Sequence, residues 1–323
     1  MVYIVARNAG RYNNNLCGNL PTTFSIGSAL QSFNLHGNKV QGTIPLSLEN
    51  CQRLEVLDLG DNLLNDTFPM WLGTLPELRV LSLRSNKLHG PIRTLGSGTM
   101  YLELQMLDLS SNAFTGNVPT SMFQHLKAVR KIDPSKKAPS GLIALRVLNL
   151  SHNGLEGHIP RSLGSLSSVE SLDLSGNHLV GEIPAQFASL TALEVLSLSY
   201  IHLKGCIPQG NQFHTFENNS YEGNDGLRGF PLSKGCGNDS HDSASEETYT
   251  GSEFDEESNY EFLNDFWKAA LMGILLNDMD RWNLLGRFNS SSFKKVEDNI
   301  AFGDMGRGER LPMYLTKEKS GPA

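Results

Sequence analysis

Leucine and other apolar residues recur at a fixed spacing along the first two thirds of the chain. The phrase L-x2-L-x-L-x2-N-x-L-x-G-x-I-P is clearest at 145–160 and returns at 169–184 with Val in the first place. Its Asn falls at positions 14, 38, 62, 86, 112, 153 and 177, and Ile201 takes the next place. The steps are 24, 24, 24, 26, 41, 24 and 24 residues. Self-similarity with this period predicts a leucine-rich-repeat solenoid.

Each residue type in the repeat has a physical role. The L-x-L core predicts a short strand whose Leu side chains point inward, while the residues between them face outward on a concave parallel sheet. The Asn amide can pair backbone groups of neighbouring turns, Gly accepts a backbone conformation closed to other residues, and Pro fixes φ. We expect an α/β-type repeat solenoid with a short 3-10 or irregular convex side, whose turns are stable only when stacked.

Two steps depart from the 24-residue period. The 26-residue step, around 96–98, predicts a small loop insertion. The 41-residue step equals one repeat plus 17 residues, and its extra segment, placed at 120–143, is basic and flanked by Pro. A single interruption of this kind is either a binding loop or the scar of a lost piece of sequence.

Composition adds a charge pattern and a compartment signal. The chain has 39% apolar and 19% charged residues and a formal net charge of −7, which excludes a basic nucleic-acid binder. Ten Asp or Glu and no Lys or Arg lie in 237–265. The four Cys lack the spacing of zinc or redox motifs. Five Asn-x-Ser/Thr sequons favour a secretory route and predict glycosylation at Asn65, Asn149, Asn218, Asn238 and Asn289.

Neither a signal peptide nor a complete membrane helix is expected in the chain as written. The N-terminal apolar stretch holds about five residues, whereas a secretory apolar region needs roughly 7–15. The later apolar run Phe266–Leu276 is interrupted by Lys268 and ends at Asn277. Because crossing a bilayer takes about 20 residues, this run is too short to span a membrane.

Catalytic and metal-binding patterns do not rise above background. His152 and His158 are separated by a loop of the repeat, which makes metal ligation improbable. The Gly-rich stretch at 303–308 lacks the strand, helix and Lys of a phosphate-binding loop. No kinase motif follows the apolar run. We expect a protein that is not an enzyme, with no catalytic residues, metal or cofactor.

Function is therefore expected on the concave sheet, because solenoids bind proteins and peptides over extended curved surfaces. Asp58, Asp108 and Asp173 occupy the common L-D-L place and have a purely structural alternative. Arg84, His36 and Met106 are less typical of the repeat. The candidate ligand contacts are His36, Asp58, Arg84, Met106, Asp108, Ser151, Asp173 and Ser199. A glycan on Asn149 would restrict binding near its turn.

With these residues in view, the chain resembles plant extracellular leucine-rich-repeat receptors, and among them the Cf-type receptor-like proteins of tomato and its relatives. The most specific stretches follow the last repeat: G-C-I-P-Q-G-N-Q-F at 205–213, N-S-Y-E-G-N at 219–224 and G-L-R-G at 226–229. They resemble the C-terminal cap of that family, and 237–265 resembles its acidic juxtamembrane segment. The start of its membrane helix is echoed at 266–273, so the resemblance covers 14–273.

The resemblance also carries expectations about the cysteines. Many relatives have Cys in the place that Arg228 holds here, so Cys236 needs another partner, and Cys206 is the candidate nearest the final turn. Such a bridge would stabilise the cap by roughly 3–4 kcal/mol in the chain-entropy model. Cys17 and Cys51 are expected to act as small buried hydrophobes, with a redox role as the less favoured alternative.

The resemblance implies a cell-surface immune receptor at the plasma membrane, facing outward. It would sense a pathogen-derived or apoplastic protein or peptide and signal through partner receptor kinases or co-receptors, without binding nucleic acid. A soluble inhibitor or decoy of a secreted cell-wall hydrolase and a nonfunctional receptor fragment are the alternatives. Family members begin with a signal peptide, an N-terminal cap and further repeats, so the resemblance also implies a truncated copy or a faulty gene model.

These observations predict six segments along the chain. They are an irregular start at 1–13, a solenoid of about eight repeats at 14–208 interrupted at 120–143, a cap at 209–236, an acidic spacer at 237–265, an aborted membrane-helix-like segment at 266–276 and a polar, mostly disordered tail at 277–323.

Overall fold

The computed structural model describes residues 8–10, 14–94, 101–126, 145–210, 212–232, 235–236 and 316–317. The chain divides into two units, Met1–Gly237 with Pro312–Ala323, and Asn238–Leu311. The second unit lies outside the described residues. So do the acidic spacer, the segment at 266–276, nearly all of the tail, Asn238, Asn289 and most of the predicted interruption. All of the structure below belongs to the first unit.

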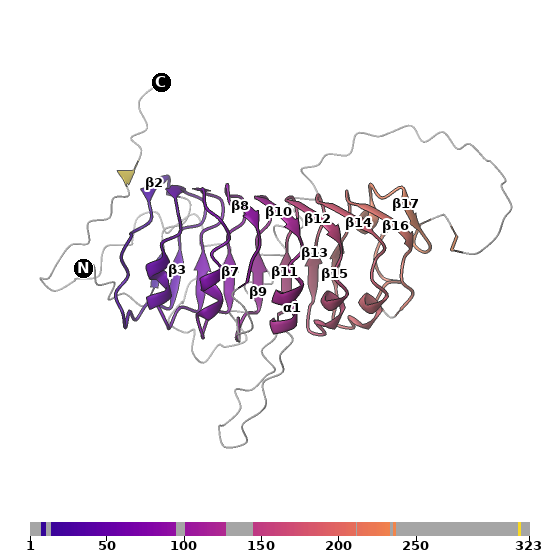
Figure 1. Cartoon of the computed structure of the whole chain (residues 1–323), viewed down its shortest axis with the longest axis horizontal. Coiled ribbons are helices and arrows are strands. Elements are labelled where there is room, and N and C mark those ends of the chain that lie inside the picture. The colour runs from indigo at the N-terminus through magenta and orange to yellow at the C-terminus, as the bar shows by residue number, and fades with distance from the viewer. Residues whose placement is uncertain are drawn as a thin grey trace, which may run out of the picture. The chain divides into compact units, whose positions relative to one another are not determined.

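Short parallel strands, one from each turn, form a long eight-stranded sheet (Figure 1). Its strands follow one another in chain order, as expected for a solenoid in which each turn pairs only with its neighbours. In order they are β1 (Asn8–Gly10), β3 (Ser32–Asn34), β5 (Val56–Asp58), β7 (Val80–Ser82), β9 (Met106–Asp108), β11 (Val147–Asn149), β13 (Ser171–Asp173) and β15 (Val195–Ser197).

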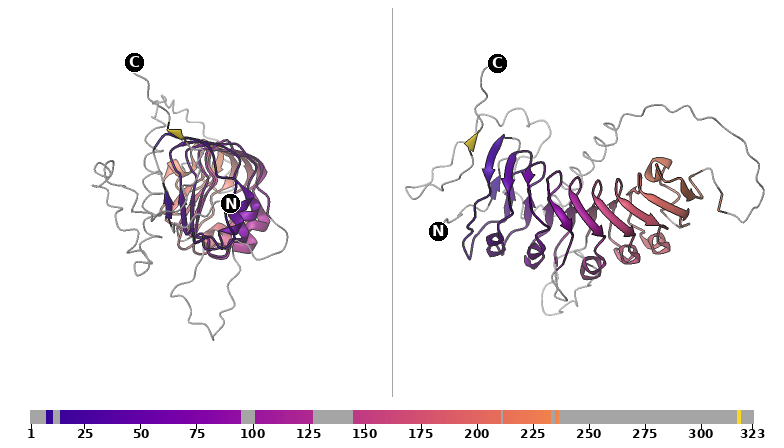
Figure 2. Two further views of the ribbon diagram at one scale, coloured as in Figure 1. Left: turned by 90° about the vertical axis from the view of Figure 1, so that its left-hand side faces the viewer. Right: turned by 45° about the horizontal axis from the view of Figure 1, so that its top comes forward.

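The register of this sheet is constant across both irregular steps of the sequence. Leu81 pairs with Leu107 across the 26-residue step, and Leu107 pairs with Leu148 across the 41-residue step. Both irregular steps therefore leave the paired Leu residues of the neighbouring strands in register. The views in Figure 2 show the described turns stacked one behind another.

Two smaller sheets continue the turns beyond the long sheet. The second sheet contains β8 (His89–Pro91), β10 (Ala113–Asn117), β12 (Gly154–His158), β14 (His178–Gly181), β16 (His202–Cys206) and β17 (Gly226–Arg228), all parallel. The third contains β2 (Leu16–Asn19), β4 (Lys39–Gly42) and β6 (Leu63–Leu64), and β18 (Thr316–Lys317) joins β2 in the antiparallel direction.

On the convex side, several turns carry a short helix that begins directly after the Pro of the repeat. Pro45, Pro69, Pro160 and Pro184 immediately precede 3-10 turns, where a fixed φ favours the start of a helix. These turns are η1 (Leu46–Asn50), η2 (Met70–Thr74), η3 (Arg161–Ser165) and η4 (Ala185–Ser189), together with the α-helix α1 (Thr120–Leu126) and, in the cap, η5 (Asn218–Tyr221).

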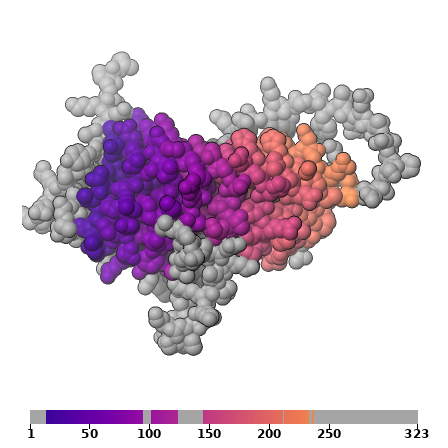
Figure 3. Space-filling view, viewed as in Figure 1, coloured from indigo at the N-terminus to yellow at the C-terminus, as the bar shows by residue number. Residues whose placement is uncertain are grey.

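The core is a column of leucine side chains held between the sheets and the convex turns. Leu57, Leu81, Leu107 and Leu148 have no exposed surface. They stack directly over one another because their strands pair in register. Figure 3 shows the described turns as one packed body whose colour passes from indigo to orange. Each turn thus covers the apolar face of the next.

The repeat Asn residues form a buried or half-buried ladder that satisfies the backbone of the turns. Asn62 donates from Nδ2 to the carbonyls of Leu35 (2.9 Å), Leu59 (3.1 Å) and Gly60 (2.8 Å), and its Oδ1 accepts from the Val40 amide (3.0 Å). Equivalent bonds are made by Asn86, Asn112, Asn153 and Asn177.

Glycine in the L-x-G place is required for space as well as for conformation. Gly181 has φ +93°, a left-handed value that side chains disfavour, and a Cβ there would lie 2.5 Å from Cδ2 of His158 in the preceding turn. Asp66 replaces Gly at one turn and accepts from the Ile44 amide at 2.9 Å, so its carboxylate pairs with the preceding turn.

Regular elements lie within three of the segments that the sequence predicts as irregular, interrupting or disordered. Residues 8–10 form β1 and pair with β3. Residues 120–126 form α1, which contacts η3 on the convex side. Residues 316–317 form β18. The division of the chain into six segments stays a prediction.

Candidate ligand-binding face

The eight candidate contacts belong to one surface of the long sheet. We use the term inner face for one surface of the long sheet. It is formed by the residues of β3, β5, β7, β9, β11, β13 and β15 whose side chains alternate with the buried Leu, and by the two or three residues that follow each of these strands. Across the sheet, Asn34, Asp58, Ser82 and Asp108 lie in direct register, and Asn149 and Asp173 continue the same row. The sheet thus brings together, in one surface, residues from seven successive turns.

Exposure separates the candidates into two groups. His36, Arg84 and Ser199 are half-exposed. The other five have at most 9% of their surface exposed and are Asp58, Met106, Asp108, Ser151 and Asp173. The sequence pattern did not indicate this burial, and ligand contact by these five residues stays a prediction.

Local turns account for the acidic residues of the row. The Asp108 carboxylate accepts from the Ser110 amide (3.1 Å) and hydroxyl (2.6 Å), and Asp173 accepts likewise from Ser175 (3.0 and 2.6 Å). Asp58 accepts from the Gly60 amide at 3.1 Å. These bonds close the chain as it leaves each strand, which supports the structural alternative for the L-D-L residues.

A charged cluster crosses three turns at the N-terminal part of the inner face. Arg84 Nη2 and His36 Nε2 each lie 2.9 Å from the same oxygen of Asp61, and His36 Nδ1 lies 3.5 Å from Asp58 Oδ1. We call His36, Asp58, Asp61 and Arg84 the inner-face ion cluster. It contains Asp61, which was not among the candidates from the sequence.

The cluster changes the acid–base properties of its members. The Asp58 and Asp61 carboxylates raise the pKa of His36 to about 9, against burial, which lowers it. Burial opposes ionisation of Asp61, but the His36 hydrogen bond and the Arg84 charge outweigh it and hold the pKa of that carboxyl well below its usual range. Burial raises the pKa of the neighbouring Asp108 to about 6, although Ser110 and Arg84 favour its charged form.

A second set of polar contacts runs along the residues just before the strands. Gln31 Nε2 donates to Glu55 at 3.2 Å, and Arg146 pairs with Glu170 at 2.6 Å through Nη2. Arg79 Nε lies 3.8 Å from Glu55. Complementary polar residues one repeat apart in the sequence were the signal that could have predicted these contacts. Half-exposed pairs of this kind contribute little to the free energy of unfolding.

Two of the predicted glycosylation sites are open to solvent and one is not. Asn65 and Asn218 are exposed, whereas Asn149 is 4% exposed and its Oδ1 accepts from the Ser151 amide (2.9 Å) and hydroxyl (2.7 Å). The hydroxyl of its own sequon therefore holds the Asn149 side chain in the sheet.

We expect glycans on Asn65 and Asn218, and none on Asn149, when the chain is produced through a secretory pathway. A glycan at Asn149 would have to break its side-chain bonds and leave a buried site. Peptide mass spectrometry after enzymatic deglycosylation measures the occupancy of each site. A folded fraction glycosylated at Asn149 would contradict this prediction.

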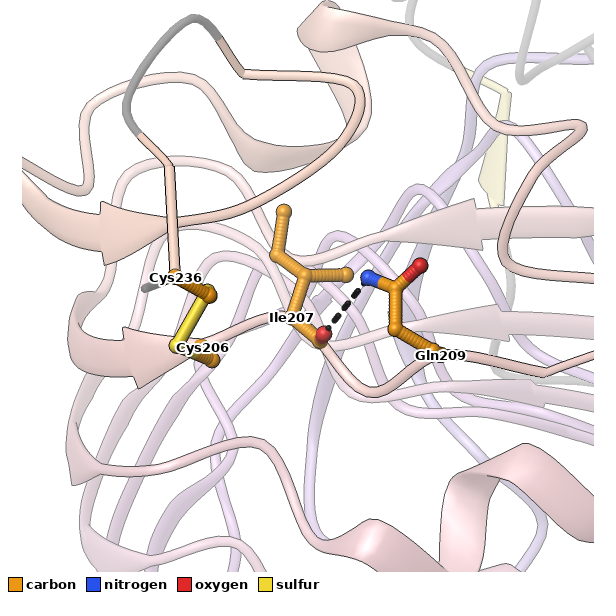
Figure 4. Close-up of a disulfide and its surroundings, with 4 residues drawn as sticks. All are labelled: Cys206, Ile207, Gln209 and Cys236. Carbon is orange, nitrogen blue, oxygen red and sulfur yellow. Dashed lines mark hydrogen bonds between the residues drawn. A yellow bond between two sulfur atoms is a disulfide. The ribbon is translucent and has the colours of Figure 1, made fainter. Parts of the chain in front are cut away.

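The cap closes the last turn with a disulfide between Cys206 and Cys236, the pair that the resemblance suggested (Figure 4). A Cβ on Gly229 would lie 2.9 Å from Cys236 Sγ, so the bridge passes over a residue with no side chain. Gln209 Nε2 donates to the Ile207 carbonyl at 3.1 Å beside it. Cys17 and Cys51 form no disulfide, and burial raises the pKa of the Cys51 thiol.

The cap also resumes the Asn ladder, which the sequence analysis missed. Asn224 donates to the carbonyls of Leu198 (2.7 Å) and Tyr221 (2.9 Å) and accepts from the Leu203 amide (2.9 Å). Asn224 lies 23 residues after buried Ile201, which takes the place of the repeat Asn. This spacing, close to the 24-residue period, could have predicted a further ladder position. The cap is thus a ninth, shortened turn.

No group of three or more His, Cys, Asp or Glu within the described ranges could hold a metal ion. In the same part of the chain, no helix is long and apolar enough to cross a membrane.

Comparison with known proteins agrees with this architecture. Leucine-rich-repeat family models match residues 14–88 and 135–179, and residues 103–125. Receptor-like protein Cf-9 homolog of Solanum lycopersicum is 46% identical over 304 residues, covering 78% of this chain and 35% of that protein. Receptor-like protein Cf-9 of Solanum pimpinellifolium is also 46% identical, covering 78% and 34%. The chain spans about a third of the length of these curated relatives.

Two solved structures share the fold. The plant peptide hormone receptor RGFR1 in complex with RGF2 matches with a TM-score of 0.50 and 33% identity, over 59% of this chain and 28% of that one. PEPR1 in complex with AtPEP1 matches with a TM-score of 0.50 and 31% identity, over 59% and 24%. The chain is therefore a leucine-rich-repeat protein, related in sequence to the Cf-9 receptor-like proteins of tomato and its relatives.

Proposed function

We propose that the chain is the recognition part of a non-enzymatic, cell-surface receptor-like protein that binds a peptide or protein on the inner face of its long sheet. The observation that carries this proposal is the in-register inner face itself, on which seven successive turns align polar residues, with His36, Arg84 and Ser199 half-exposed among them. Extended curved surfaces of this kind are what solenoids use to bind partners.

Relatives and neighbours support the class of ligand. The relatives are receptor-like proteins, and two ectodomains of the same fold were solved with RGF2, a ligand of a peptide hormone receptor, and with AtPEP1. We extend this likeness to propose a location on the outer side of the plasma membrane and signalling through a partner receptor kinase or co-receptor. Exposed acceptor sites at Asn65 and Asn218 fit that location.

The proposal predicts that a bulky side chain on the inner face blocks binding. Ser199 is half-exposed on this face, and Ser199→Trp would fill space in front of β15, whereas Ser189→Trp adds the same side chain to the exposed end of η4. The immobilised chain is incubated with peptides from plant extracellular fluid, and retained peptides are quantified by mass spectrometry.

We expect Ser199→Trp to reduce retention of the specific peptides by about tenfold or more, the scale of losing one good contact. Ser189→Trp should leave retention unchanged. Equal losses in both variants, or a loss only with Ser189→Trp, would reject the inner face as the binding surface. Retention of an intact secreted hydrolase in place of peptides would instead favour the soluble inhibitor.

A further inference from the structure

The inner-face ion cluster joins three consecutive turns through one carboxylate. Asp61 receives Arg84 from the following turn and His36 from the preceding turn, each at 2.9 Å. His36 in turn lies against Asp58, with 3.5 Å between Nδ1 and Oδ1. The side chains are 12–34% exposed, so the cluster is partly shielded from water and yet open on the inner face. Charges in such a position interact more strongly than charges on an open surface.

Gly60 provides the space in which the cluster assembles. It is absent from the described glycines with positive φ, so its backbone conformation does not demand glycine. A Cβ at this position would lie 2.9 Å from His36 Nδ1, 3.0 Å from Arg84 Cγ and 3.2 Å from Asp58 Oδ1. Any side chain here would push the three charged residues apart. Glycine is therefore needed at position 60 because the side chains of His36, Arg84 and Asp58 converge above it.

The charges that meet at this place, among the described residues, come from four turns. His36 comes from the turn of β3, Asp58 and Asp61 from that of β5, Arg84 from that of β7 and Asp108 from β9. With every acid ionised and His36 protonated, three carboxylates face two cations. Protonation of Asp108 balances the set, whereas loss of the His36 proton leaves Arg84 alone against three carboxylates. Loss of the proton from Asp108 and loss of the proton from His36 therefore both give the cluster excess negative charge.

We propose that the inner-face ion cluster is a proton-linked clamp that holds the turns of β3, β5 and β7 together in acid and loosens as the pH rises. Because His36 and Arg84 are half-exposed on the proposed binding surface, the clamp would make ligand contact there depend on pH. This coupling to the ligand rests on the proposed function. The clamp itself does not.

The sign of the effect follows from both titrating groups. The pKa of His36 is raised from 6.5 to about 9, so its stabilisation is fully present below pH 6.5 and is lost as the pH rises through about 9. The pKa of Asp108 is raised from 3.8 to about 6 by burial, so ionising it also destabilises the fold as the pH rises between those values. Both groups favour the clamp in acid.

The test compares His36→Gln with wild type in denaturant unfolding from pH 5 to pH 10. Exposed His178 lies on the second sheet, so His178→Gln is the matched control. Wild type should lose roughly tenfold to a hundredfold in its folding equilibrium constant between pH 6.5 and 9 relative to His36→Gln. The control should follow wild type. A His36→Gln profile parallel to that of wild type over this range would overturn the clamp.

A titration of the wild-type protein covers the case in which His36→Gln does not fold. The His36 ring signal in NMR should titrate near pH 9, and titration near 6.5 would overturn the proposal. Gly60→Ala should move that titration toward 6.5. An unchanged His36 titration in folded Gly60→Ala would contradict the role given to Gly60.

The coupling to ligand has a separate readout in the retention of extracellular peptides at pH 6 and pH 9. Wild type should retain several times less at pH 9, and His36→Gln should lose this dependence. If His36 titrates near 9 but retention depends on pH equally in both proteins, the clamp stands and its coupling to the ligand is rejected. If no peptide is retained at either pH, the proposed function and the coupling that rests on it fail, while the stability and NMR tests still decide the clamp.

Discussion

Replacing Asn177 by alanine should lower the free energy of unfolding by about 3–5 kcal/mol. The Asn177 amide donates to the carbonyls of Leu150 (3.0 Å), Leu174 (2.9 Å) and Ser175 (3.2 Å), and its Oδ1 accepts from the Leu155 amide (3.1 Å). The side chain is 3% exposed, so water cannot replace these bonds. Each buried group left unpaired costs about 1–3 kcal/mol, which makes one Asn a large contributor to the stack.

Urea unfolding followed by circular dichroism measures this loss, with Asn219→Ala as the matched control. Asn219 is exposed in η5 and is not the acceptor residue of its sequon, so its replacement should change stability by less than about 1 kcal/mol. A loss of similar size in both variants would show that the ladder is not what holds the turns. A loss below about 1 kcal/mol for Asn177→Ala would show the same.

Removing the cap disulfide by Cys206→Ser should cost about 3–4 kcal/mol, the chain-entropy estimate for a closed loop of about 30 residues. The bridge spans 30 residues and fixes Cys236 over Gly229 at the end of the second sheet. Because it acts on the shortened turn that contains Asn224, its loss should expose the C-terminal edge of the stack before the rest.

Thermal unfolding is measured for wild type and for Cys206→Ser, each with and without reductant. This comparison separates the effect of losing the disulfide from the effect of replacing the Cys206 side chain. Reductant should destabilise wild type and leave Cys206→Ser unaffected. Cys17→Ser is the control for replacing a cysteine outside the bridge and should change stability by less than about 1 kcal/mol. If reductant destabilises Cys206→Ser as much as wild type, the Cys206–Cys236 bridge is not the source of the effect.

The repeated parts of the fold could be predicted from the sequence because each repeat residue acts through its nearest neighbours. The spacing of Leu and Asn determines which groups are buried and paired, and the register of Leu57, Leu81 and Leu107 follows from it. The structure differs from the sequence-based expectation where residues adopt the strand or helix of a repeat without carrying its sequence motif. Residues 8–10 form a strand without the Leu pattern, and α1 fills a convex place where η1, η2, η3 and η4 of other turns are 3-10 helices.

The candidate site was less predictable because it depends on contacts between turns. The L-x-L pattern shows which residues face away from the core, but it does not show that Met106 and Asp108 are buried. Nor does it show that His36, Asp61 and Arg84 converge, since this requires the space left by Gly60 and the register of three turns. Sequence patterns describe one turn at a time, whereas a surface is a property of the stack.

The measurement that tests the proposed function most directly is site-specific photo-cross-linking. A photoreactive benzoylphenylalanine is placed at Ser199 on the inner face, or at exposed Gln186 on η4 as the control, and the protein is irradiated in plant extracellular fluid. Recognition on the inner face predicts a covalently captured peptide at Ser199 and none at Gln186. Specific capture at Gln186 with none at Ser199 would contradict it.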